Sequence, residues 1–118
     1  MPIRFEITGD PVEVSSRAAT LLAIVINELV DNALDHGLGE HGGILGVDAW
    51  CVDTDAFVQV RDDGPTRPPV PNRASTGLGL TIIETLVTAD LGGTFEFKRE
   101  EDWTRAIIKF TPGELLDE

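Results

Sequence analysis

The stretch Asn27-Glu28-Leu29-Val30-Asp31-Asn32-Ala33 decides how this sequence is interpreted. Glu28 and Asn32 are four residues apart, so in a helix both side chains project from one side. A helix is predicted because apolar residues recur at about 100° per residue, namely Leu22, Val25, Ile26, Leu29, Val30 and Ala33. A helix that needed only solubility would not require a carboxamide at the edge of its buried face. We therefore expect chemistry at Glu28 and Asn32, with a solvated polar face as the alternative.

A metal ion suits this pair of side chains. Magnesium prefers oxygen ligands and keeps several waters, so one protein ligand plus phosphate oxygens is sufficient. The carbonyl oxygen of Asn32 can be that ligand. Glu28 can hold a metal-bound water or accept a proton from an attacking nucleophile.

Two further motifs follow along the chain. Asp62-Asp63-Gly64 closes an expected strand, where a carboxylate can accept a hydrogen bond from an exocyclic amine such as that of adenine, and Gly64 lets the backbone approach the base. Gly77-Leu78-Gly79-Leu80 lies where a loop meets a helix, and unpaired amides at such a junction favour phosphate. Taken alone, Asp62-Asp63-Gly64 is also typical of a plain turn, and Gly77-Leu78-Gly79-Leu80 is also typical of an ordinary junction between a loop and a helix. The order of all three motifs predicts a site for a magnesium nucleotide.

The loop of residues 65–76 is rich in proline and carries Arg67 and Arg73 in a strongly acidic protein. It could fold over a bound triphosphate as a lid, with Arg73 near the phosphates. An ordinary surface loop is the alternative.

Composition excludes several classes of function. The chain has 118 residues, enough for one domain, and a net charge of -12 with only nine Lys and Arg residues. Nucleic acids and anionic membranes require clustered cations, so neither is an expected partner. No apolar stretch is long enough to span a bilayer. Cys51 is the single cysteine, which excludes an intrachain disulfide; we expect it to be buried, in a protein of the reducing cytoplasm.

The hydrophobic pattern predicts the order β-α-β-β-loop-α-β-β. Strands are expected at 3–7, 44–52, 57–62, 94–99 and 104–110, with helices from 15 or 16 to about 38 and from about 78 to 91. Paired strands with intervening helices favour an α/β sandwich that has its helices on one face of a mixed sheet. Because the chain begins almost directly on a strand, we expect a domain, residues 1–118, of a larger protein.

In this order and spacing, the three motifs resemble the ATP-binding domain of bacterial sensor histidine kinases. That domain belongs to the gyrase, heat-shock chaperone, histidine kinase and mismatch-repair ATPase superfamily. The resemblance implies an α+β fold of the Bergerat type, a two-layer sandwich whose mixed, mostly antiparallel sheet carries about three helices on one face. It implies magnesium binding by Asn32 and catalysis by Glu28. It also implies nucleotide-binding roles for Asp62, Gly64, Gly77, Leu78, Gly79, Leu80 and Thr104.

By this resemblance the domain binds ATP and Mg²⁺ and donates the γ-phosphoryl group to a histidine on a separate dimerisation domain, upstream of a response regulator. A stand-alone anti-sigma-factor serine kinase of the same fold is one alternative; Leu91-Gly92-Gly93-Thr94 favours the histidine kinase. A degenerate, non-catalytic ATP-binding module is the other. Its support is that Thr66 stands where the family usually has Gly, that Asp35 stands where Lys is frequent, and that the lid is short.

Overall fold

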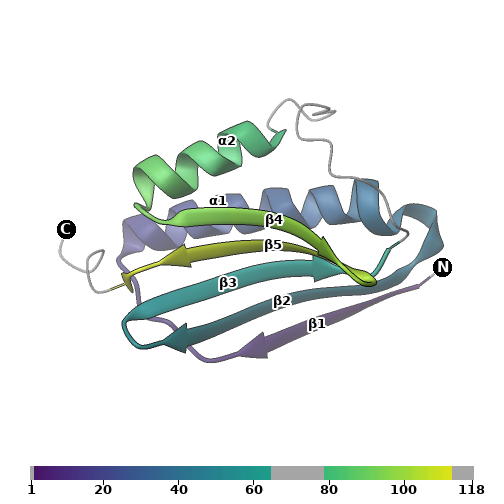
Figure 1. Ribbon diagram of the computed structural model, residues 1–118, viewed down its shortest axis with the longest axis horizontal. Coiled ribbons are helices and arrows are strands. Elements are labelled where there is room, and N and C mark those ends of the chain that lie inside the picture. The colour runs from purple at the N-terminus through teal and green to yellow at the C-terminus, as the bar shows by residue number, and fades with distance from the viewer. Residues whose placement is uncertain (1, 65–78, 113–118) are drawn as a thin grey trace.

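The computed structural model describes residues 2–64 and 79–112 (Figure 1). Its elements follow the order β1 (Ile3–Gly9), α1 (Ser16–Asn32), η1 (Ala33–Leu38), η2 (Gly39–His41), β2 (Gly43–Val52), β3 (Asp55–Asp62), α2 (Gly79–Thr85), η3 (Leu86–Asp90), β4 (Thr94–Glu100) and β5 (Trp103–Phe110). The segments η1 and η3 are π-helical and prolong α1 and α2, whereas η2 is a short 3₁₀ turn. The expected order of strands and helices is confirmed.

The strands form one five-stranded sheet in the order β1-β2-β3-β5-β4. β1 runs parallel to β2, and the other neighbouring pairs are antiparallel. Both helices lie on the same face of the sheet (Figure 1). The expected two-layer sandwich with a mixed, mostly antiparallel sheet is confirmed. Where the resemblance implied about three helices, the described part of the chain has two α-helices, each prolonged by its π-helical segment.

α1 begins at a capped N-terminus. The Ser15 hydroxyl oxygen accepts a hydrogen bond from the backbone N–H of Ala18 at 3.1 Å, which satisfies a donor that has no partner within the helix. Ala18, Val25 and Leu29 are buried against the sheet. Beyond Asn32 the helix continues in the wider π geometry of η1, so the helical run ends near the expected position but not as a regular α-helix.

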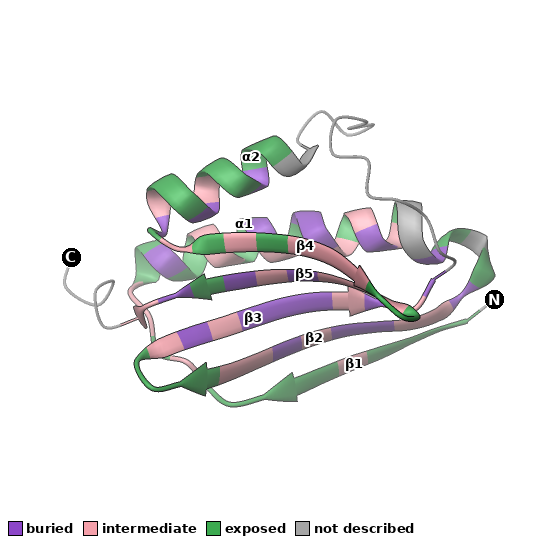
Figure 2. Cartoon of the chain, viewed as in Figure 1, coloured by how far each residue is buried: buried purple, intermediate pink, exposed green. Residues whose placement is uncertain are grey.

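The core lies between the helices and the strand residues that face them. Val58 and Val60 on β3 are buried and pair directly with Ile108 and Ala106 on β5. Figure 2 shows this buried band along the middle strands, while β1 at the sheet edge is mostly exposed. Because side chains alternate across a strand, the intervening residues lie on the opposite face of the sheet, which no described helix covers.

Cys51 lies on the surface, so the prediction that it is buried was wrong. It is close to the end of β2, next to the turn that leads into β3. An apolar neighbourhood in the sequence predicts the strand correctly, but burial at a strand end depends on how far the helical layer extends over it.

Candidate functional site

Asp62 is the last residue of β3, and its carboxylate is buried, with 4% of the residue exposed. Its Oδ1 accepts a hydrogen bond from the backbone N–H of Gly64 at 3.0 Å. Burial raises the pKa of Asp62 above the usual 3.8, although the Gly64 hydrogen bond and the charge of Arg99 act in the opposite direction. The residue predicted to recognise a base is therefore a buried acceptor with restricted geometry.

A row of polar side chains continues from Asp62 across the sheet. Asp62 pairs with Thr104 on β5, and Thr104 pairs with Arg99 on β4. Arg99 Nη1 donates to the Thr104 hydroxyl oxygen at 2.8 Å and to the carbonyl oxygen of Gly64 at 3.4 Å. The Arg99 guanidinium thus links the Thr104 side chain on β5 to the backbone of Gly64, just after β3.

Sequence reasoning named Asp62, Gly64 and Thr104 but missed Arg99. A signal was present, since the closing hairpin turns between Glu100 and Trp103. Counting back from that turn places Arg99 directly opposite Thr104. Once the turn of a predicted hairpin is located in the sequence, the residues that lie opposite each other on its two strands can be predicted.

Asp63, unlike Asp62, forms hydrogen bonds with the backbone of β2. Its Oδ1 accepts a hydrogen bond from the backbone N–H of Ile44 at 2.7 Å, and its own backbone N–H donates to the Ile44 carbonyl at 3.2 Å. These bonds fasten the end of β3 to the beginning of β2. Asp63 thereby stabilises the bend that presents Asp62 and Gly64.

The helix that carries the first motif leads, through η1, to the same end of the sheet. Glu28 is buried, and its Oε2 has no hydrogen-bond partner among the described residues. Asn32 is half-buried and ends α1. The following segment, η1, packs on β2 and β3, and Leu38 at its end lies beside Gly43 and Asp63. A buried carboxylate oxygen without a partner is costly, which favours the prediction that Glu28 meets a ligand; that role stays a prediction.

The third motif is described only in part. Gly79 is the first residue of α2, and Leu80 follows within the same helix. Gly77, Leu78 and Arg73 lie outside the described residues, as does the whole predicted lid, so their roles stay predictions. α2 packs on α1, so the second helix lies beside the helix that carries Glu28 and Asn32.

A metal at this site would depend on few protein atoms. Within residues 2–64 and 79–112, no group of three or more His, Cys, Asp or Glu side chains is arranged to hold a metal ion. The Asn32 carbonyl oxygen still fits magnesium, because this ion is commonly held by one or two protein oxygens together with substrate phosphates and water. None of the helices in the described part is long and apolar enough to cross a membrane.

Comparisons with known proteins identify the family of this chain. Residues 18–114 match the family described as Histidine kinase-, DNA gyrase B-, and HSP90-like ATPase. The sensor histidine kinase PdtaS of Mycobacterium tuberculosis is 38% identical over 116 residues, which make up 95% of this chain and 23% of that relative. The chain thus spans about a quarter of the relative's length.

Solved structures show the same fold. The catalytic domain of histidine kinase ThkA has a TM-score of 0.77 and 25% identity, and the match covers 93% of this chain and 78% of that one. The blue-light activated histidine kinase EL346 of Erythrobacter litoralis has a TM-score of 0.81 and 25% identity, covering 95% of this chain and 36% of that one. The chain belongs to the family of histidine kinase-, DNA gyrase B- and HSP90-like ATPases, and within it to the ATP-binding domains of histidine kinases.

Proposed function

We propose that this domain binds ATP with Mg²⁺ and donates the γ-phosphoryl group to a histidine on a separate dimerisation domain of the same protein, in two-component signalling. The observation that carries the proposal is the burial of Asp62 at the end of β3, beside Gly64 and in register with Thr104. A buried carboxylate acceptor with a glycine next to it suits the exocyclic amine and flat ring of adenine.

Glu28 and Asn32 supply the reacting end of the site in this proposal. Asn32 would hold the metal, which neutralises charge on the phosphates when it is bound. Glu28, whose buried Oε2 has no partner among the described residues, would orient a metal-bound water or accept a proton from the acceptor group. Phosphoryl transfer depends mainly on positioning and charge neutralisation, so a site with few catalytic side chains is sufficient.

The phosphate end of the site is assigned to Gly77, Leu78, Gly79 and Leu80, with Arg73 closing over the nucleotide. Gly79 begins α2, and α2 packs on α1, which supports phosphates lying between the two helices. Backbone amides at a glycine-rich helix start are suitable phosphate donors.

The remaining partners follow from the family. We propose that residues 1–118 are one ATP-binding domain of a longer sensor, because PdtaS extends well beyond the matched part. A response regulator is the proposed downstream partner; ThkA has been solved in complex with the response regulator protein TrrA. We place the domain in the cytoplasm, where ATP is available, with no direct membrane contact and no nucleic-acid partner, as the charge of -12 favours.

Titration calorimetry with a non-hydrolysable ATP analogue, with and without Mg²⁺, tests the proposal. We expect binding that Mg²⁺ strengthens and that Asp62→Asn weakens. Asp53→Asn is the matched control, since it makes the same change at an exposed turn. Absence of binding would refute the proposed nucleotide site. Binding without phosphotransfer to the parent protein's histidine would leave the degenerate module as the better reading, and transfer to a serine would favour the anti-sigma-type kinase.

A further inference from the structure

The outer edge of β1 carries free backbone hydrogen-bonding groups. The carbonyl of Pro2 accepts from Gly43 at 3.4 Å, and the N–H of Asp10 donates to Ala49 at 3.0 Å. Backbone groups alternate in direction along a strand, so the even-numbered residues of β1 point to β2. The N–H and C=O groups of the odd-numbered residues therefore point away from the sheet, where no described strand pairs with them. The odd-numbered residues are Ile3, Phe5, Ile7 and Gly9.

The side chains along this edge are apolar and exposed. Ile3, Phe5 and Ile7 share the core-facing side of the sheet with their β2 partners, yet they are 38%, 56% and 72% exposed. Their strand, β1, lies at the margin of the sheet and is mostly exposed (Figure 2). Edge strands usually carry a bulge, a proline or a lysine that discourages pairing. β1 has an unbroken register with β2 from Ile3 to Gly9 and neither Pro nor Lys within it.

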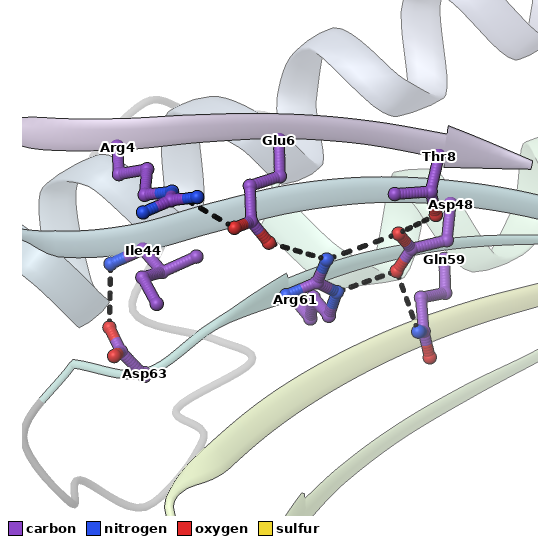
Figure 3. Close-up of polar contacts among 8 residues, drawn as sticks. All are labelled: Arg4, Glu6, Thr8, Ile44, Asp48, Gln59, Arg61 and Asp63. Carbon is purple, nitrogen blue, oxygen red and sulfur yellow. Dashed lines mark hydrogen bonds and ion pairs between the residues drawn. The ribbon is translucent and has the colours of Figure 1, made fainter.

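The opposite face of β1 is charged and held in place. Arg4 Nε lies 3.1 Å from Glu6 Oε2, and Arg61 Nη2 lies 3.1 Å from Glu6 Oε1 (Figure 3). Arg61 also contacts Asp48 at 2.6 Å, and the Thr8 hydroxyl donates to Asp48 at 2.6 Å. β1 is thus fixed to β2 and β3 through side chains as well as backbone, so its edge is ordered before any partner arrives.

The sequence of this edge is complementary to itself. In an antiparallel pair centred on Phe5, Arg4 of one copy lies opposite Glu6 of the second copy, and Glu6 lies opposite Arg4. Ile3 then faces Ile7, and Phe5 faces Phe5. The free backbone groups of the odd-numbered residues become the hydrogen-bonded pairs, which leaves the charged residues at the closer, non-hydrogen-bonded positions. Opposite charges and apolar residues at these positions stabilise a strand pair.

We propose that the β1 edge is a docking site for a second copy of this chain, which joins two sheets across a twofold axis through antiparallel β1 strands in the register centred on Phe5. Both copies use the same surface, as a closed twofold interface requires. A strand pair buries less than a standard interface of about 1,600 Å², so the association of free chains is expected to be weak and dependent on concentration.

Single-cysteine variants test the register directly. In a background of Cys51→Ser, Phe5→Cys places two cysteines opposite each other with Cα atoms about 5.5 Å apart, within disulfide range. Ile7→Cys is the control, because its two copies would lie about 13 Å apart along the pair. Random collision favours Ile7→Cys, since Ile7 is the more exposed residue. We expect disulfide-linked dimers to form at least tenfold faster with Phe5→Cys. Equal rates, or faster cross-linking of Ile7→Cys, would overturn the proposal.

A charge exchange provides a second, independent test. Arg4→Glu places Glu opposite Glu6 of the second copy, and Glu6→Arg places Arg opposite Arg4. We expect each variant alone to sediment as a weaker dimer than the wild type at equal concentration. An equimolar mixture should recover wild-type association, because each copy then meets its complement. If the mixture associates no better than the separate variants, while circular dichroism shows both to be folded, the proposed register is wrong.

Discussion

Asp62 and Thr104 lie directly opposite each other on β3 and β5, and Arg99 on the neighbouring strand β4 donates a hydrogen bond to the Thr104 hydroxyl oxygen at 2.8 Å. The arrangement gives the end of the sheet a buried carboxylate, a hydroxyl and a guanidinium in a single row. The positions of all three residues are set by the register of the sheet rather than by a loop.

Asp62→Asn should weaken adenine nucleotides more than guanine nucleotides. The ionised carboxylate accepts a hydrogen bond from the adenine amine, whereas guanine presents a carbonyl at the equivalent ring position. Losing a buried hydrogen-bond partner costs about 1–3 kcal/mol, so adenine affinity is expected to fall by roughly 5- to 150-fold. Calorimetric titration with both nucleotides measures the difference. Equal losses for the two bases would contradict the assignment.

Arg99→Met should raise the pKa of Asp62 further. Burial already raises this pKa, and the positive charge of Arg99 is among the influences that lower it. Arg99→Lys is the control, because it keeps a positive charge near the carboxylate while removing the planar guanidinium that contacts Thr104 and Gly64. Carboxyl NMR titration of the three proteins reports the pKa. The same pKa in the wild type and in Arg99→Met would show that the guanidinium charge does not reach Asp62.

Asn32→Ala should abolish the magnesium dependence of nucleotide binding and leave the fold intact. Asn32 is half-buried at the end of α1, where its carbonyl oxygen is the proposed ligand. Asn32→Asp is expected to retain part of the effect, since a carboxylate also binds magnesium. Asn27→Ala is the matched control, an exposed asparagine on the same helix. If calorimetry finds the wild-type response to Mg²⁺ in Asn32→Ala, another residue holds the metal.

The sequence predicted the order of strands and helices along the chain well, because each element depends on local periodicity. It named Asp62 and Thr104 as nucleotide-binding residues, which stays a prediction, and it did not find the contact of Arg99 with Thr104, since cross-strand contacts depend on register. The prediction that Cys51 is buried failed for a different reason. An apolar residue in a strand is buried only where the opposite layer covers it, and the width of the helical layer is a property of the assembled fold.

Arg61→Met should destabilise the fold by about 3 kcal/mol. The Arg61 and Asp48 side chains are only 13% and 11% exposed, so the substitution leaves a largely buried carboxylate without its main ionic partner. Burial acts to raise the pKa of Asp48, but hydrogen bonds from Arg61, Thr8 and Gln59 hold it below the usual 3.8. Urea denaturation at pH 7 measures the loss. Arg4→Met is the control, because Arg4 forms an exposed ion pair and such pairs contribute little.

The lowered pKa of Asp48 determines how the stability of the fold should respond to acid. Because its pKa is lower in the folded state than in the unfolded state, Asp48 stabilises the fold above about pH 4, and this contribution is lost as the pH falls through the folded pKa. The wild type should therefore lose more stability than Arg61→Met as the pH falls from about 5 through the folded pKa of Asp48. Parallel curves for the two proteins would indicate that the hydrogen bonds do not favour the ionised form.

The chain by itself should bind ATP but should not phosphorylate its own His36 or His41. The backbone of His36 belongs to η1, which directly continues the helix that carries the proposed metal ligand Asn32, so we expect it to stay with that helix. His41 lies in the short turn η2 after it. The acceptor histidine must then come from a separate domain. Incubation with labelled ATP followed by acid and alkali treatment tests this, since phosphohistidine is labile in acid and stable in alkali. Alkali-stable, acid-labile label on this chain alone would overturn the proposed division between ATP-binding and acceptor domains.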